Sequence, residues 1–200
     1  MKQEEKNLQS RKRILDSALR EFAAKGYGQG SVNAVCEEGK ISKGNLYHYY
    51  RDKDELYLAC VQECFESLTM YLRGRTPAHG DAQEQMEAYF DARLAYFREN
   101  PDCQRLFCEV LVSPPPRLAA RIEACRADFD ALNLEVMGGV LERVRLRPDV
   151  TKAEVLSLLG QFQDFINARC QRRDGQAGAG EREESCRRAL SVLLYGVVER

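Results

Sequence analysis

The sequence predicts an all-α fold of about nine helices, and three observations lead to this class. Apolar residues recur at i, i+4 and i+8 through nearly every segment of the chain. The apolar–polar alternation of a half-buried strand is missing. Glycines and prolines, with serine or aspartate caps, divide the chain into segments of helical length. With 200 residues, 44% of them hydrophobic, the chain can form one large or two modest domains.

Charge is distributed unevenly along the chain. Residues 1–50 carry 9 Lys/Arg against 6 Asp/Glu, whereas residues 51–200 carry 21 against 25, and the formal net charge is −1. A modestly basic N-terminal part on an acidic body fits an N-terminus that contacts nucleic acid. No apolar run approaches the roughly 18 residues of a membrane span, and the charged first ten residues do not resemble a signal peptide. We therefore expect a cytoplasmic protein.

The first predicted helix runs from about Leu8 to Lys25. Gly26 follows, and glycine commonly stands just past a helix end. The stripe expected to face the core consists of Ile14, Leu15, Ala18, Leu19, Phe22 and Ala23.

Two very short helices follow the first. Ser31 is placed to cap one of them, which Gly39 closes before a Lys40–Ile41 turn. Ser42 caps the other, which spans Lys43–Tyr49. The buried face of the first short helix is expected to consist of Val32, Val35 and Cys36. Two helices of about two turns, joined by a turn containing glycine, form a helix-turn-helix unit.

A long helix is predicted from residue 53 to about Arg73. Asp52, with Glu55 three residues later, resembles a capping box at its start. Its apolar row consists of Leu56, Cys60, Cys64, Leu68 and Leu72. Further helices are expected at about 81–99, 102–112, 117–145, 151–172 and 181–198, with breaks at 74–80, 113–116, 148 and 175–180.

The last two predicted helices, near 151–172 and 181–198, are apolar on more sides than a monomer's surface helices need. Such a pair at a chain terminus favours a four-helix bundle formed with a second copy, and hence a homodimer. Burial against the chain's own domain is the alternative.

Residues 26–57 carry a specific motif, GYGQGSVNAVCEEGKISKGNLYHYYRDKDELY. It resembles the N-terminal domain of TetR-family transcriptional regulators over about the first 60 residues, with one departure, since Cys36 stands where the family usually has alanine. The resemblance implies a three-helix DNA-binding domain over residues 1–52 and a helical effector-binding and dimerisation domain over 53–200. It also implies a repressor that a small-molecule effector releases from a near-palindromic double-stranded DNA operator.

The residues expected to contact DNA lie in and around the second short helix. A recognition helix presents short or planar polar groups near its N-terminus to the major groove. The expected set is Ser31, Ser42, Lys43, Gly44, Asn45, Tyr47, His48, Tyr49 and Lys53. Leu46 and Tyr50 are expected to pack against the first helix. An aromatic surface cluster with ordinary solvated lysines is the alternative for the same residues.

The second function class is a helical protein-interaction module that uses the tyrosine-rich turn without binding DNA. An enzyme is not expected, because the chain has two histidines, His48 and His79, and no GxGxxG, P-loop, HExxH or EF-hand pattern. No cofactor is expected. The eight cysteines contain no CxxC pair, so we interpret them as small buried core residues, with a metal or redox role as the less favoured reading.

Effector-binding candidates are aromatic, sulfur-bearing or aliphatic residues on the helices after residue 53. They are Phe65, Leu68, Tyr71, Tyr89, Phe90, Tyr96, Phe107, Cys108, Phe129, Met137 and Phe162. Their spacing equally suits a plain core. Glu109 and Asp164 stand between apolar neighbours, where each is a possible anchor for a cationic ligand or part of a polar strip.

Overall fold

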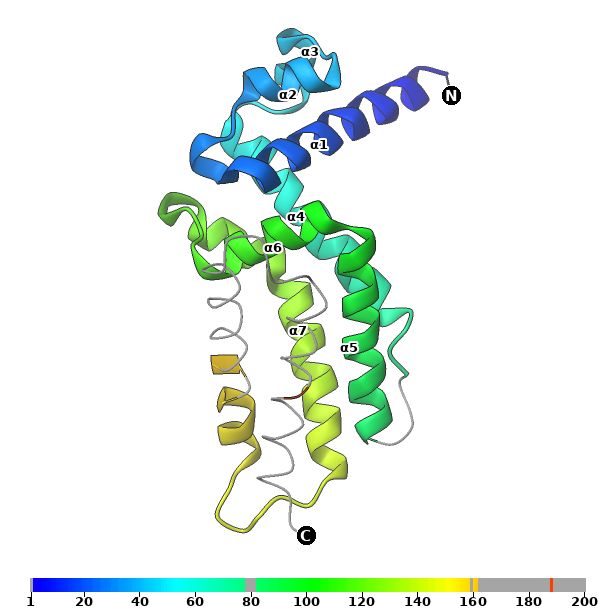
Figure 1. The fold of residues 1–200 in the computed structure, drawn as a ribbon, viewed down its shortest axis with the longest axis vertical. Helices are drawn as coiled ribbons and strands as arrows, with labels where there is room; N and C mark the ends of the chain where they lie inside the picture. Colours follow the sequence, from blue (N-terminus) through cyan, green and yellow to red (C-terminus); the bar gives the residue numbers. More distant parts are fainter. Residues whose placement is uncertain (1, 78–81, 159, 162–187, 189–200) are drawn as a thin grey trace. The chain divides into compact units, whose positions relative to one another are not determined.

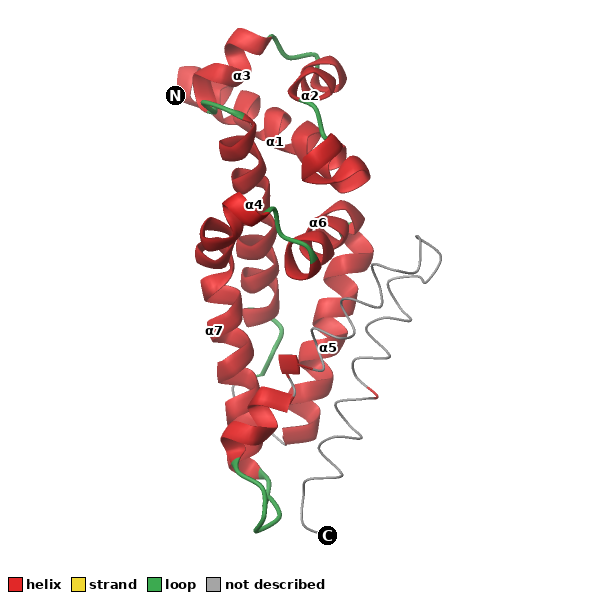
Figure 2. Ribbon diagram, turned by 90° about the vertical axis from the view of Figure 1, so that its left-hand side faces the viewer, coloured by secondary structure: helices red, strands yellow, loops and turns green. Residues whose placement is uncertain are grey.

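The computed structural model describes residues 2–77, 82–158, 160–161 and 188. These residues form helices joined by short turns and contain no β-strand, which confirms the all-α class (Figures 1 and 2). The described chain divides into two compact units. The first comprises residues 1–65 with 101–126, and the second comprises residues 66–100 with residues from 127 onward. The functional boundary expected after residue 52 stays a prediction.

Helix α1 (Lys2–Gln29) begins six residues earlier than the apolar stripe predicts. Its first turns are rich in Lys, Glu and Gln, which favour helix without a buried face. Ile14, Ala18 and Phe22 are fully buried, as the stripe requires. The prediction that Gly26 ends the regular helix is confirmed, because its φ of 70° and ψ of 172° interrupt the helical path.

Helices α2 (Val32–Gly39) and α3 (Lys43–Tyr49) form the predicted helix-turn-helix. The left-handed residue of the turn is Lys40, with φ 51°, and its N–H donates to the carbonyls of Cys36 and Glu37. Gly39 is required for a different reason, since a Cβ there would overlap Ile41 and lie 2.7 Å from Ser17 Oγ. Close packing on α1 therefore fixes the glycine before the turn.

Helix α4 (Lys53–Arg73) has the predicted bounds. The Glu55 N–H donates to Asp52 Oδ1 at 2.9 Å, and the Arg51 N–H donates to Glu55 Oε2 at 2.7 Å. This reciprocal cap lowers the pKa of Asp52, chiefly through the Glu55 N–H. The predicted apolar row is buried along its whole length, at Leu56, Cys60, Cys64, Leu68 and Leu72.

The first unit also contains α6 (Pro101–Val112), the short 3₁₀ helix η1 (Pro116–Leu118) and the start of α7 (Ala119–Arg143). Helix α6 packs against α1. The ring of Phe65 on α4 lies 5.3 Å from that of Phe107 on α6. This packing brings α4, α6 and the end of α1 together.

In the second unit, α5 (Ala82–Glu99) carries most of the buried aromatic side chains. The Tyr96 ring lies 5.3 Å from that of Tyr71, and its hydroxyl lies 2.5 Å from Ser67 Oγ. Tyr89 donates a hydrogen bond to Asn133 on α7. Arg93 is fully buried beside Phe97. Polar groups thus accompany the aromatic core of this unit.

The helices predicted near 151–172 and 181–198 lie almost wholly outside the described residues. Residues 152–158 are helical, with Val155 buried and Leu158 49% exposed. Within the part of the chain that the structure describes, no helix combines the length and apolar character needed to cross a membrane.

Candidate nucleic-acid interface

The start of α3 is fixed by its cap. Ser42 is extended, with φ −71° and ψ 145°, and its Oγ accepts the Asn45 N–H at 3.2 Å. The predicted cap is therefore confirmed. It holds the first turn, Lys43 to Asn45, as a rigid element.

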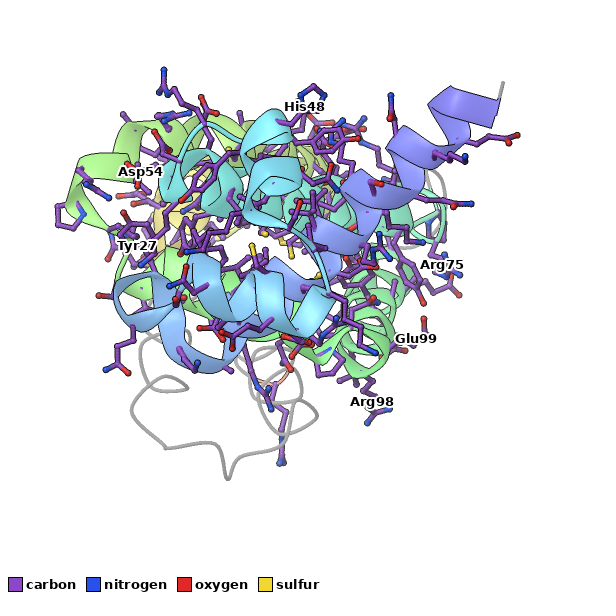
Figure 3. All side chains as sticks on the ribbon, turned by 90° about the horizontal axis from the view of Figure 1, so that it is seen from above. Tyr27, His48, Asp54, Arg75, Arg98 and Glu99 are labelled. Atoms are coloured by element: carbon purple, nitrogen blue, oxygen red, sulfur yellow. The ribbon has the colours of Figure 1, made fainter. Side chains whose placement is uncertain are left out.

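Helix α3 presents polar groups outward on a buried base. Leu46 is fully buried and Tyr50 is 6% exposed, and Arg11 of α1 donates to the Tyr50 hydroxyl at 3.4 Å. Ser42, Lys43, Gly44, Tyr47 and His48 are exposed, and Asn45 is half-buried. Figure 3 shows His48 projecting away from the surrounding helices. The segment offers donors and acceptors to an outside partner.

Three other predicted contact residues have partners within the first unit. The Tyr49 hydroxyl donates to the Asn7 carbonyl at 3.4 Å. Ser31 precedes α2 as predicted, but its side chain makes no capping bond, and its N–H donates to Glu21 Oε1 at 3.0 Å instead. Lys53 Nζ donates to the Gly28 carbonyl at 3.3 Å and lies 4.7 Å from the centre of the Tyr27 ring.

Tyr27, Asp54, Glu109 and Arg117 form a cluster that we name the Tyr27 junction. The Tyr27 hydroxyl donates to Asp54 Oδ1 at 2.6 Å, and Arg117 donates both to that hydroxyl and, at 2.6 Å, to Asp54. The Tyr27 N–H donates to Glu109 Oε1 at 2.8 Å. Figure 3 shows Tyr27 and Asp54 on the same side of the molecule. Helices α4 and α6 thus both hold the end of α1.

Glu109 is the least expected member of this cluster. Burial raises the pKa of its carboxyl to about 7. A Cβ added at Gly26 would lie 2.9 Å from its Oε1. A hollow of about 370 Å³ adjoins it, lined by Tyr27, Gly28, Glu109, Ser113, Arg117 and the three prolines 114–116. The sequence signal was a carboxylate between apolar neighbours, but its partner lies 82 residues away.

The effector-binding candidates fall into different parts of the fold. Phe65, Phe107 and Cys108 are buried in the first unit. In the second unit Leu68, Tyr89, Phe90, Tyr96 and Phe129 are buried, and Tyr71 and Met137 are half-buried. Phe162 and Asp164 lie outside the described residues. The assignment of a ligand site to these side chains stays a prediction.

The geometry described so far defines a helix-turn-helix unit, and comparison with known families shows which family this unit resembles. Residues 14–60 match the family described as "Bacterial regulatory proteins, tetR family". This match covers the end of α1, the whole helix-turn-helix and the start of α4. Over these residues the chain is similar to the N-terminal domain of TetR-family regulators.

Two curated relatives are similar over part of their length. The HTH-type transcriptional activator FasR of Mycolicibacterium smegmatis is 27% identical over 128 residues, which is 62% of this chain and 58% of FasR. The biofilm operon icaADBC HTH-type negative transcriptional regulator IcaR of Staphylococcus epidermidis is 32% identical over 60 residues, which is 30% of this chain and 32% of IcaR. The matched part is less than two thirds of either relative.

A solved structure supports the fold over nearly the whole chain. The transcriptional regulator FadR of Bacillus subtilis, solved in complex with stearoyl-CoA, superposes with a TM-score of 0.72 at 14% identity. The superposition covers 92% of this chain and 98% of FadR. At this identity the likeness concerns the fold.

Proposed function

We propose that this chain is a sequence-specific DNA-binding transcriptional regulator, a repressor that a small-molecule effector releases from its operator. The observation that carries the proposal is α3, whose capped first turn presents exposed polar side chains on a base formed by Leu46 and Tyr50. A helix of this kind enters the major groove with its N-terminal residues toward the base edges.

The side chains of α3 divide by what they can bind. Asn45 has the amide geometry that pairs with adenine in the major groove. Lys43 and Tyr47 are suited to phosphate oxygens, which position a protein without reading sequence. Gly44 leaves room for close approach, since its outward side meets no other atom within 4 Å. Specificity is therefore assigned to Asn45, and general affinity to the lysines.

Substitutions at Asn45 and Lys53 test this assignment after selection of bound genomic fragments has given the operator. Asn45→Ala should cost roughly 1–3 kcal/mol on the operator and relax preference at one position. Lys53→Ala should weaken binding to all duplexes and reduce the salt slope by about one phosphate. Lys152→Ala, which removes the same charge outside the proposed interface, is the control. Unchanged operator affinity and preference in Asn45→Ala would remove α3 from this role.

A protein-interaction module is the competing function. Duplex binding whose affinity falls steeply with salt would exclude it, because phosphate contacts release counterions. A reporter fused to the operator shows whether the chain represses or activates transcription. The relatives' names do not decide this, because FasR is an activator and IcaR is a negative regulator. Repression predicts higher expression when the regulator is deleted.

The Tyr27 junction supports the effector half of the proposal. Asp54 on α4 and Glu109 on α6 hold the hydroxyl and the backbone N–H of the same tyrosine, at 2.6 and 2.8 Å. A shift of either helix must therefore be transmitted to the end of α1. Coupling between sites is typically worth 1–3 kcal/mol, or about 5- to 150-fold in affinity, and it is reciprocal.

The effector is proposed to be largely apolar or aromatic, because the candidate residues are mostly aromatic and buried. FadR, solved with stearoyl-CoA, adds long-chain acyl-CoA thioesters to the compounds to be tested. A thermal-shift screen of hydrophobic metabolites and acyl-CoAs, followed by operator titration with each hit, tests the proposal. If every compound that binds leaves operator affinity unchanged, the effector half is wrong.

A homodimer formed through the helices near 151–172 and 181–198 completes the proposal. Light scattering should give twice the chain mass, and a charge at Leu193 or Leu194 should give monomers or aggregates that have lost tight operator binding. Two copies of α3 predict operator half-sites about one helical turn, roughly 34–36 Å, apart or slightly more. A monomeric wild-type chain would contradict this part.

A further inference from the structure

We propose that Cys64 and Cys103 form a redox-active dithiol, which hydrogen peroxide or a comparable small peroxide converts into a disulfide between α4 and α6. Both cysteines lie in the first compact unit. The proposal concerns a covalent modification site, so it stands or falls independently of DNA binding.

The two sulfur atoms are already placed for bond formation. Cys64 Sγ and Cys103 Sγ lie 2.8 Å apart, with the Cys64 thiol donating to Cys103. A disulfide bond measures about 2.05 Å, so bond formation would bring the two sulfurs closer by less than 1 Å. The contact between the Phe65 and Phe107 rings, 5.3 Å apart, holds the same two helices together beside the pair.

The two thiols have different environments. Cys103 is 8% exposed and stands in the first turn of α6, where unpaired backbone N–H groups favour an anion. Cys64 is 3% exposed, and its hydrogen bond to Cys103, together with burial, raises the pKa of its thiol. Cys103 is therefore assigned as the attacking thiolate and Cys64 as the resolving thiol.

The reaction consumes one peroxide for each pair. The Cys103 thiolate attacks one peroxide oxygen, the O–O bond breaks, and the released hydroxide takes up a proton, leaving a sulfenic acid on Cys103. Cys64 sulfur then attacks Cys103 sulfur, the S–O bond breaks, and the hydroxyl leaves as water with the Cys64 proton. Two thiols and one hydrogen peroxide thus give one disulfide and two waters.

Cys60 provides a matched control on α4. It lies one turn before Cys64 and is equally buried, but its thiol faces the Leu15 carbonyl of α1 at 3.9 Å. Burial raises the pKa of the Cys60 thiol. Cys108 provides the corresponding buried control on α6.

A disulfide here would join the two helices that support Tyr27. The closed loop between residues 64 and 103 restricts the unfolded chain, so oxidation should raise the Tm, on the order of 5–10 °C. Thiol reductants should reverse the shift.

Peptide mapping of the full-length chain tests the proposal. The reduced protein is treated with hydrogen peroxide, the remaining thiols are alkylated, and the chain is digested with trypsin. We expect the peptide of residues 54–73 to be joined to that of residues 99–105, with a loss of two hydrogen atoms. The Cys60→Ala and Cys108→Ala variants should keep this link.

The two remaining variants test the assigned order. Cys64→Ala should stop at a sulfenic acid on Cys103 that dimedone traps, and Cys103→Ala should leave Cys64 reduced. The peptide map of the wild-type chain tests the disulfide even if a variant fails to fold. A link through Cys60 or Cys108, a link between two chains, or complete alkylation after peroxide treatment would overturn the proposal.

Discussion

Helix α3 and the Tyr27 junction use polar side chains in opposite ways. Within the described part of the chain, Lys43, Tyr47 and His48 of α3 make no side-chain hydrogen bond to other residues. At the junction the backbone N–H, the hydroxyl and the ring of Tyr27 each contact an ionisable side chain. The α3 groups that we propose contact DNA stay solvated, whereas the groups that connect helices are satisfied within the fold.

This difference has an energetic consequence. A solvated polar group loses little when it is truncated, whereas a half-buried one leaves its partner without a hydrogen bond, at about 1–3 kcal/mol. Substitutions on the exposed side of α3 should therefore change binding and spare stability. Substitutions at the junction, or under α3, should change stability.

The sharpest contrast is between two adjacent residues of α3. Leu46→Ala removes a fully buried side chain and should destabilise the chain by roughly 2–5 kcal/mol. Tyr47→Ala, at a side chain that is 49% exposed, should change the free energy of unfolding by about 0.5 kcal/mol or less. Urea unfolding measures both. Equal losses would mean that Tyr47 also supports the fold.

The next contrast is between two glycines near the junction. Gly26→Ala places a side chain at φ 70°, 2.9 Å from Glu109, and should cost about 1–3 kcal/mol. At Gly28 a Cβ meets no atom within 4 Å, so Gly28→Ala should be close to neutral. If both variants unfold at the same denaturant concentration as wild type, position 26 tolerates a side chain and the expected strain is absent.

Glu109 gives the junction a pH dependence. Its pKa rises from 4.5 to about 7 on folding, so the neutral acid is the form the fold favours. The resulting stability is complete below pH 4.5 and is lost as pH rises through about 7. Glu109→Gln should remove this pH dependence. The stability of the variant relative to wild type should therefore rise between pH 4.5 and about 7. Parallel stability curves from urea unfolding at a series of pH values would contradict the assignment.

The smallest expected effect is at Arg117, which is 65% exposed although it contacts Asp54 at 2.6 Å. Arg117→Ala should cost about 0.2–1 kcal/mol, and salt should reduce the difference. Arg147→Ala, which breaks an exposed pair with Asp149, serves as the matched surface control. A loss well above 1 kcal/mol would show that the junction depends on this ion pair.

Local chemistry made much of the fold predictable. Ser42, Asp52 and Gly26 mark helix ends through short-range hydrogen bonds or backbone conformation, and the helix ends they predict agree with the structure. The start of α1 was wrong, because charged residues of high helix propensity extend a helix without an apolar stripe.

Long-range pairs were not predictable in the same way. Glu109 was interpreted as a ligand anchor or a member of a polar strip, yet it accepts the Tyr27 N–H. Cys64 and Cys103 were interpreted as core residues, with a metal or redox role less favoured, and their contact with each other was not predicted. The Tyr27–Glu109 contact joins residues 82 positions apart, and the Cys64–Cys103 contact joins residues 39 positions apart. The period of apolar residues along a helix carries no information about partners this distant in the sequence. The exposed α3 residues were accessible to sequence reasoning because they form one local pattern.

The bend at Gly26 also constrains the order in which this junction can change during evolution. Its φ of 70° and ψ of 172° lie in a region that essentially only glycine occupies, so shortening Glu109 would relieve the contact without freeing position 26. A side chain gained at position 26 would meet both the unfavourable backbone conformation and the Glu109 carboxyl. Divergence should therefore begin at position 109, and descendants that keep the bend should retain the glycine whatever residue faces it.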